Sequence, residues 1–151
     1  MKKLNLPAYE FKLKQEGKKT KIFDALRKKE LVLTPEEWVR QHVVHFLIEE
    51  RNFPKGLIAL EKSLKLNGLT KRTDILIYGK NGKPLFMVEC KAPEIKITQK
   101  VFDQISRYNI SLNLPYLMVT NGLEHFCAKI DFIDRNVSFL KEIPYFEELI
   151  Y

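Results

Sequence analysis

The sequence has few of the features that mark secreted, membrane-spanning or disulfide-bonded proteins. Only two cysteines, Cys90 and Cys127, occur among its 151 residues, too few for a disulfide framework or a zinc cluster, and we interpret both as buried, reduced thiols. No apolar run approaches the roughly 18 residues of a membrane helix. The N-terminus carries no long apolar segment typical of a secretory signal. These absences predict a cytoplasmic protein that does not bind a membrane.

Sequence motifs for nucleotide binding and signs of several domains are missing as well. Neither G-x-x-x-x-G-K-[ST] nor G-x-G-x-x-G occurs, so the sequence gives no support to a nucleotide-driven motor or a dinucleotide fold. A chain of 151 residues is long enough for one hydrophobic core and too short for two ordinary domains. We therefore expect one domain over residues 1–151, with a core at about 34–131 behind an N-terminal β lead-in of residues 1–33.

Positive charge exceeds negative charge, with 26 Lys and Arg against 19 Asp and Glu and a net charge of +7. The excess is concentrated in the first half of the chain, at residues 12–21, at 27–29 and in the pair Lys71 and Arg72. Clustered positive charge favours a polyanionic partner such as DNA. A solvated face that keeps the protein soluble is the alternative explanation.

A helix is predicted to begin after Thr34. Thr34 is a suitable N-cap, Pro35 suits the first helical position, and Glu37 falls three residues after the cap, as in a capping box. Residues 52–54 are expected to end this helix. Its apolar stripe consists of Val39, Val43, Phe46 and Leu47.

The remaining pattern predicts a mixed α/β fold. Short apolar runs bounded by Gly, Asn and Pro predict strands, and an amphipathic run from Thr98 to about Ile110 predicts a second helix. This order is typical of a mixed central sheet flanked by helices. Strands are expected at 9–14, at 56–68 with a turn at Asn67 and Gly68, at 73–78, at 83–91, at 115–122 with its turn, and at 123–132, before a short tail.

Three ionisable residues interrupt the apolar strands at 73–78 and 83–91, namely Asp74, Glu89 and Lys91. Because side chains on a strand alternate between faces, Glu89 and Lys91 point the same way, and an antiparallel pairing puts Asp74 opposite Glu89 or Met87 on that same face. Two neighbouring carboxylates repel each other, and a divalent cation such as Mg²⁺ relieves that repulsion. The alternative is an ion pair between Asp74 and Lys91 at a sheet end, with Glu89 solvated.

With these residues the sequence resembles the D…(D/E)-x-K core of the PD-(D/E)XK nuclease superfamily. TDILIY (73–78) and FMVECKAP (86–93) supply that core, and VFDQISRY (101–108) resembles the Q-x-x-x-Y helix of the RecB-like branch. TPEEWVRQ and VTNG, which lie before and after the core, resemble the N-terminal nuclease domain of type I restriction enzyme R subunits. The resemblance covers about residues 34–131 and implies a restriction-endonuclease-like core. Thr73 stands where the superfamily often has proline.

The resemblance implies Mg²⁺-dependent hydrolysis of DNA phosphodiesters, with Mn²⁺ as a substitute. Asp74, Glu89 and the Cys90 carbonyl would bind the metal, and Lys91 would orient the attacking water. Glu37 matches a helix glutamate that approaches the metal in the family. We expect a nuclease domain without the ATP-driven motor, so a separate motor or specificity subunit would be a partner besides DNA. Supporting or DNA-contacting roles would fall to Gln104, Tyr108, Arg72, Lys71 and Arg40.

Several of these residues have plainer explanations. Glu37 also completes a capping box, Arg72 could simply neutralise Asp74, and Gln104 and Tyr108 could be a polar helix residue and a core tyrosine. Arg40 and Gln41 could support the site or simply be exposed.

Two histidines, His42 and His45, are spaced like metal ligands but lack a third, so we interpret them as surface or packing residues. For the whole chain, the second interpretation is a catalytically silent nucleic-acid-binding or assembly subunit with the same fold. A third is an unrelated α/β domain with a surface ion pair.

Overall fold

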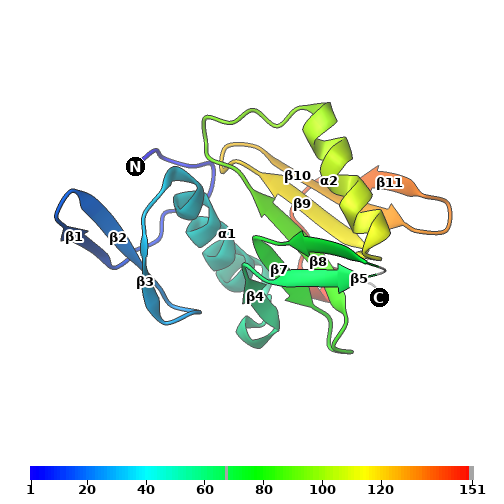
Figure 1. Ribbon diagram of the computed structural model, residues 1–151, viewed down its shortest axis with the longest axis horizontal. Helices are drawn as coiled ribbons and strands as arrows, with labels where there is room; N and C mark the ends of the chain where they lie inside the picture. Colours follow the sequence, from blue (N-terminus) through cyan, green and yellow to red (C-terminus); the bar gives the residue numbers. More distant parts are fainter. Residues whose placement is uncertain (67, 150–151) are drawn as a thin grey trace.

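The computed structural model describes residues 1–66 and 68–149, which form three β-sheets and two α-helices (Figure 1). Within these residues, no helix has the length and apolar character needed to cross a membrane. The helices are α1 Pro35–Arg51 and α2 Gln99–Ser111, with short 3-10 helices at η1 Lys55–Leu57 and η2 Phe146–Glu148. The strands are β1 Leu13–Glu16, β2 Lys19–Asp24, β3 Lys29–Val32, β4 Ile58–Leu60, β5 Ser63–Leu66, β6 Leu69–Arg72, β7 Ile75–Tyr78, β8 Pro84–Cys90, β9 Tyr116–Thr120, β10 His125–Asp131 and β11 Asn136–Phe139.

The largest sheet has six strands in the order β11-β10-β9-β8-β7-β4. Only β8 and β9 run parallel among its neighbouring pairs, so the described sheet is mixed, as predicted. Ile75 of β7 pairs with Val88 of β8. This pairing continues to Asp74 and Glu89, one step further along each strand, which is the first of the two predicted registers. At the other end a register shift pairs Tyr78 with Pro84 instead of the expected Leu85.

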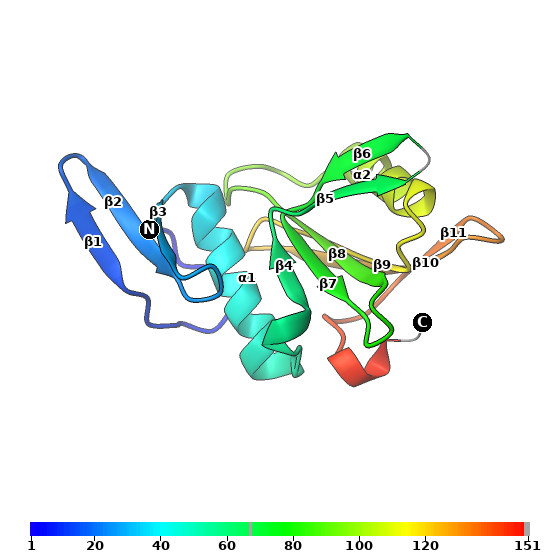
Figure 2. The same cartoon turned by 60° about the horizontal axis from the view of Figure 1, so that its bottom comes forward.

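The two faces of this sheet pack against different helices. Ile75 and Ile77 belong to the core formed with α1, whereas Leu76 between them belongs to the core formed with α2. Val88 and Met87 of β8 alternate between the same two cores. This period of two is the one that a strand imposes on its side chains. Two apolar faces and two amphipathic helices therefore account for the layered arrangement in Figures 1 and 2.

Helix α1 begins and ends where its sequence predicts. The Thr34 hydroxyl accepts a hydrogen bond from the Glu37 main-chain N–H at 3.0 Å, which satisfies one of the free donors of the first turn. At the other end Asn52 adopts a left-handed conformation with φ 61°, and its N–H bonds to the Leu47 carbonyl, a common helix termination. α1 thus holds its polar first turn in a fixed position beside the sheet.

The N-terminal residues form a separate three-stranded sheet, β1-β2-β3, which lies beside α1 (Figure 1). The predicted strand at 9–14 is wrong in its position, because β1 begins only at Leu13. Tyr9 and Phe11 instead pack their rings against α1, with centroid distances of 5.3 and 4.8 Å to His45. Burial of these aromatic rings outweighs the local alternation that favours a strand.

The single strand predicted at 56–68 is also wrong. The chain forms η1 and β4 there, and then leaves the main sheet to form the β5–β6 hairpin, which lies beside α2 (Figure 2). The break falls at Glu61, whose φ of 52° is incompatible with a continuous strand. The turn predicted at Asn67 and Gly68 involves Asn67, which lies outside the described residues.

The expected tail after residue 132 also contains structure that the sequence pattern did not indicate. β11 pairs antiparallel with β10, with Ile130 opposite Val137, and forms the edge of the main sheet. Further on, Ile143, Phe146 and Leu149 are buried in the core that includes α1. The C-terminal residues therefore contribute to the core.

Removal of the α1 N-cap should destabilise the protein. We expect Thr34→Ala to lower the free energy of unfolding by about 1 kcal/mol, because the Glu37 N–H loses its partner. Urea denaturation followed by circular dichroism would measure this change, and Thr34→Ser, which keeps a hydroxyl, should retain most of the stability. Equal stability of Thr34→Ala and wild type would contradict the role of this cap.

Candidate functional site

The predicted residues Asp74, Glu89 and Lys91 lie together at one end of β7 and β8. Asp74 Oδ2 accepts a hydrogen bond from the Cys90 main-chain N–H at 2.7 Å, which fixes its side chain across the hairpin. Asp74 and Lys91 both lie close enough to Glu89 to change the pKa of its carboxyl group. The predicted alternative, in which Asp74 pairs with Lys91 and Glu89 is solvated, does not fit Glu89, which is only 6% exposed.

Glu89 is a buried carboxylate next to a second carboxylate. Burial raises its pKa most, and the negative charge of Asp74 raises it further, against the opposing effects of Lys71 and Lys91. Lys71 Nζ lies 3.1 Å from Glu89 Oε1. Lys71 is therefore the charge partner of the buried Oε1 atom, and it opposes the rise in the pKa of Glu89.

Lys71 connects this pair of carboxylates to α2. It is the third residue of β6, and its Nζ lies 5.1 Å from the centre of the Tyr108 ring, a cation–π contact. Tyr108 therefore faces the end of β8, as the Q-x-x-x-Y resemblance implies. Gln104 lies one turn earlier on α2 and is exposed. Lys71 thus forms an ion pair with Glu89, and its expected supporting or DNA-contacting role stays a prediction.

α1 brings two more predicted residues to the site. Arg40 is buried, with Nη2 at 3.9 Å from Asp74 Oδ1 and Nη1 at 2.9 Å from Glu61 Oε1. Burial lowers the pKa of Arg40, but its short contact with the accepting Glu61 carboxylate and the charges of Glu37 and Asp74 outweigh that effect and raise the pKa. Arg40 is thus a buried counter-ion. The alternative in which Arg40 is exposed to solvent is therefore wrong.

Glu37 does not use its side chain as a capping box would require. Its carboxylate accepts a hydrogen bond from Gln41 Nε2 at 3.0 Å and lies 3.6 and 3.7 Å from Arg27 and Arg40. Only the main-chain half of the predicted box, from the Glu37 N–H to Thr34, is present. Glu37 therefore belongs to the charged network beside Asp74.

The charged network continues to the N-terminal sheet. Asp24, at the end of β2, pairs with Arg27 at 2.6 Å and accepts a hydrogen bond from Gln41 at 3.2 Å. Burial raises the pKa of Asp24, but the hydrogen bonds from Arg27 and Gln41 outweigh it and lower the pKa. Arg27 also contacts Glu61 at 2.8 Å. The three-stranded sheet and the end of the main sheet are thus joined by ion pairs.

Arg72 remains the most accessible of the predicted cations near the carboxylates. Its side chain is 69% exposed and its Nη2 lies 3.5 Å from Glu61 Oε2. The predicted neutralising partner for Arg72 was Asp74; the contact in the structure is with Glu61.

The two histidines of α1 pack against aromatic rings, as expected. The His42 ring lies 4.3 Å from the Trp38 ring and 4.9 Å from the Phe11 ring, and burial lowers the pKa of His42. Across residues 1–66 and 68–149, no three His, Cys, Asp or Glu side chains are grouped so as to hold a metal ion. A metal site built on Asp74 and Glu89 would therefore need main-chain or solvent oxygens as further ligands.

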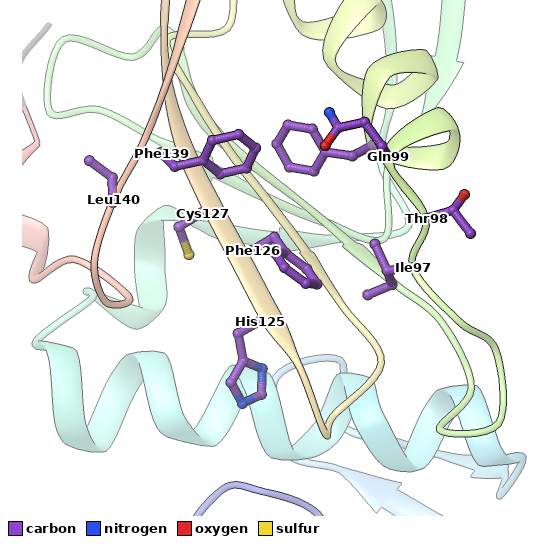
Figure 3. A pocket seen from close by; sticks show the side chains of 9 residues that line it. Ile97, Thr98, Gln99, His125, Phe126, Cys127, Phe139 and Leu140 are labelled. Atoms are coloured by element: carbon purple, nitrogen blue, oxygen red, sulfur yellow. The ribbon is translucent and has the colours of Figure 1, made fainter.

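A hollow of about 390 Å³ lies elsewhere, between the start of α2 and the strands β10 and β11 (Figure 3). It is lined mainly by apolar side chains, and both ring nitrogens of His125 are engaged, Nδ1 with Thr120 Oγ1 at 2.7 Å and Nε2 with the Asn5 carbonyl at 3.0 Å. Burial lowers the pKa of His125. None of the predicted site residues lines this hollow, so we place the candidate site at the charged cluster, where the chemistry-bearing groups are.

Sequence reasoning missed three members of the charged network, which are Asp24, Arg27 and Glu61. Asp24 follows the apolar residues Ile22 and Phe23, whereas Arg27 begins a basic run, and neither context specifies an ion-pair partner. The only local signal is that Glu61 interrupts the apolar run Leu57–Leu60 before Lys62. That signal favours a break in the strand and gives no information about its arginine partners.

Comparisons with known proteins agree with the resemblance at the level of family and fold. A family model for the type I restriction enzyme R protein N terminus matches residues 35–144. A solved fragment assigned to an HsdR subunit of a type I restriction enzyme from Vibrio vulnificus superposes with a TM-score of 0.54 at 22% identity, covering 78% of this chain and 24% of that one. This chain thus corresponds to a small part of that protein, and at such identity the likeness concerns the fold alone. No curated protein matches the chain.

The raised pKa of Glu89 predicts a specific dependence of stability on pH. The native state holds the Glu89 proton more tightly than the unfolded state does, so wild-type stability should fall as pH rises from the ordinary value of 4.5 through the raised pKa. Glu89→Gln cannot ionise and should lack this loss, so its melting temperature relative to wild type should increase over that range. Thermal melts between pH 4 and 8 would test this, with the exposed Glu94→Gln as the matched control. A constant difference at all pH values would contradict it.

Proposed function

Since this chain belongs to the family of type I restriction enzyme R protein N-terminal domains, we propose that it is a metal-dependent deoxyribonuclease domain that hydrolyses DNA phosphodiesters. The proposal includes membership of the PD-(D/E)XK superfamily and a restriction-endonuclease-like core. One observation carries it, namely the convergence of Asp74 and Glu89 at the end of a hairpin, with Lys91 beside them.

The donor set fits a hard divalent cation. The negative charge of Asp74 raises the pKa of the buried Glu89 carboxyl group, and a cation between the two carboxylates would relieve this repulsion. Mg²⁺ takes oxygen ligands and commonly uses one or two carboxylates together with water and substrate phosphate. We propose that Asp74, Glu89 and the Cys90 carbonyl hold Mg²⁺, with Mn²⁺ as a substitute.

The residues around this site have distinct roles in the proposed reaction. A bound Mg²⁺ would stabilise negative charge on the phosphate and lower the pKa of a bound water. Lys91 would orient the attacking water and favour its hydroxide form. Tyr108 and Gln104 lie on one side of α2, where they would contact the DNA backbone or support the end of β8. Glu37 would act indirectly, by holding Arg27 and Arg40 in place.

A second function, a catalytically silent nucleic-acid-binding or assembly domain, is favoured by one observation. Internal cations already neutralise both carboxylates, since Lys71 lies 3.1 Å from Glu89 and Arg40 lies 3.9 Å from Asp74. A site that is balanced in this way needs no metal for stability. Such a domain would bind DNA or join a motor or specificity subunit without cleavage.

The N-terminal sheet offers a surface for the DNA backbone. Lys18 and Lys19 lie at the β1–β2 turn and are exposed, as are Lys28 and Lys29 at the start of β3. Their ammonium groups can contact phosphates without reading sequence. Asp24 and Arg27 join the β2–β3 turn to the charged network, so DNA held by Lys28 and Lys29 would approach Asp74 and Glu89 from that turn. Lys18 and Lys19 lie at the opposite end of β2.

Cleavage of plasmid DNA separates the two functions. Incubated with Mg²⁺ or Mn²⁺, the wild-type protein should convert supercoiled DNA into nicked or linear forms, and Lys91→Ala should reduce the rate at least ~100-fold, because the attacking water loses its positioning group. Asp74→Asn should have a similar effect. The time course would be followed by gel electrophoresis with linear and single-stranded DNA alongside.

The matched control for cleavage is Lys96→Ala, an exposed lysine in the loop that follows β8. It removes the same charge and should retain wild-type activity. DNA binding with no cleavage in either metal would support the silent domain. Equal cleavage by wild type and Lys91→Ala would attribute the activity to a contaminant and overturn the nuclease proposal.

DNA binding should weaken steeply as salt rises, because each phosphate that a lysine or arginine neutralises releases a counterion. The double variant Lys18→Glu and Lys19→Glu should lower both the affinity and the salt dependence, by about one unit of slope for each phosphate that is no longer neutralised. Arg72→Glu should act in the same direction. Filter binding between about 50 and 200 mM salt would measure these slopes.

The control for DNA binding is Lys141→Glu, an exposed lysine near the C-terminal end of the described chain. It changes the net charge by the same amount per residue and should leave the slope unchanged. A similar slope for all variants would mean that the positive charge serves solubility alone.

A further inference from the structure

Glu61 occupies an unusual position between the main sheet and the β5–β6 hairpin. Its φ of 52° lies in the left-handed region, which is unfavourable for a residue with a long side chain. Its main-chain N–H donates to the Asp74 carbonyl at 3.0 Å. The backbone that carries Glu61 is therefore attached directly to the backbone that carries Asp74.

Three arginines converge on the Glu61 carboxylate. Arg40 Nη1 lies 2.9 Å from Oε1, whereas Arg27 Nη1 and Arg72 Nη2 lie 2.8 and 3.5 Å from Oε2. The hydrogen bond from Arg40 is the largest cause of the lowered pKa of Glu61. Unfavourable backbone conformations persist where surrounding contacts hold them, and they are frequent at functional sites. Here the surrounding contacts are these ion pairs.

Arg40 is shared between Glu61 and Asp74. Its Nη1 is 2.9 Å from Glu61, within hydrogen-bond distance, and its Nη2 is 3.9 Å from Asp74 Oδ1, beyond it. Arg40 is buried and cannot move into solvent. If the Glu61 charge is removed, Arg40 is deprived of its shortest ion pair. Its charge is then shared among Glu36, Glu37 and Asp74, so its attraction to Asp74 is no longer offset by Glu61.

The remaining carboxylates around Arg40 do not replace Glu61. Glu37 lies 3.7 Å from Nη1 and is already bonded to Gln41. Glu36 accepts a hydrogen bond from Nη2 at 3.2 Å, but its side chain is 45% exposed, so solvent weakens that pair. Glu61 combines the shortest ion pair to Arg40, at 2.9 Å, with a main-chain hydrogen bond to Asp74.

We propose that Glu61 is a positioning residue that holds Arg40 away from Asp74, so that the Asp74 carboxylate stays available to a divalent cation. The proposal rests on the function proposed above, because it concerns the same site. An arginine that pairs closely with Asp74 would occupy the oxygen that a cation needs. Glu61 acts through Arg40 and touches neither the cation nor DNA.

Calorimetric titration with Mn²⁺, without DNA, tests this role independently of cleavage. Glu61→Gln should weaken Mn²⁺ binding about 10-fold or more, the usual effect of removing a group that orients a metal ligand. Glu49→Gln makes the same charge change on the exposed surface of α1 and should bind like wild type. Circular dichroism and urea denaturation would verify that each variant is folded.

Two further variants distinguish the contact from a simple loss of negative charge. Glu61→Asp keeps the charge but is shorter by one methylene group, so it should also weaken Mn²⁺ binding if the contact with Arg40 is what matters. In an Arg40→Met background, where the competing cation is gone, Glu61→Gln should have little further effect. If Glu61→Gln weakens Mn²⁺ binding equally in the wild-type and Arg40→Met backgrounds, the negative charge of Glu61 acts on the cation without Arg40. That result would overturn the proposal.

A crystal structure of Glu61→Gln without metal gives a result that does not depend on metal binding or on the stability of Arg40→Met. We expect the Arg40 guanidinium to lie within hydrogen-bond distance of Asp74 Oδ1. An unchanged separation of 3.9 Å would overturn the proposal. If wild type fails to bind Mn²⁺, the proposed function falls together with this role. If wild type binds and Glu61→Gln binds equally well, only the role of Glu61 is overturned.

Discussion

Burial of charge at one end of the six-stranded sheet is the constraint on which the surrounding structure depends. Asp74 and Glu89 lie side by side there, and Glu89 is almost fully buried. A buried charge without a partner costs several kcal/mol, so the chain must supply cations from other elements. α1 supplies Arg40 and β6 supplies Lys71. The positions of α1 and of the β5–β6 hairpin therefore serve charge balance as well as hydrophobic packing.

The same balance connects stability with the proposed chemistry. Cations that neutralise carboxylates within the protein compete with any divalent ion for the same oxygens. A domain whose carboxylates form tight ion pairs with internal cations would be stable and inactive. A domain whose carboxylates lack such cations would bind metal readily but would fold poorly without it. The 3.9 Å separation between Arg40 and Asp74 lies between these limits. Natural proteins commonly accept such a compromise between stability and activity at functional sites.

Elements whose signals are local were predicted well from the sequence. α1 begins at the residue after Thr34 and ends at Arg51, with Asn52 as its C-cap, because capping groups and a left-handed terminal residue act within a single turn. The second helix begins after Thr98, as predicted. Predictions failed where distant residues decide the outcome. Tyr9 packs on α1, and the run at 56–68 breaks at Glu61 because its arginine partners come from elsewhere in the chain.

The sequence by itself indicated which charged residues come together. Alternation along the two strands predicts that Asp74, Glu89 and Lys91 lie on one side, and the structure places Asp74 and Lys91 directly next to the ends of β7 and β8. Only the tertiary structure decided how those charges are balanced. Glu61 is separated from Arg27 by 34 positions in sequence, and no local pattern specifies which arginine a distant carboxylate meets. That choice depends on the path of the chain, which is set by packing of the whole core.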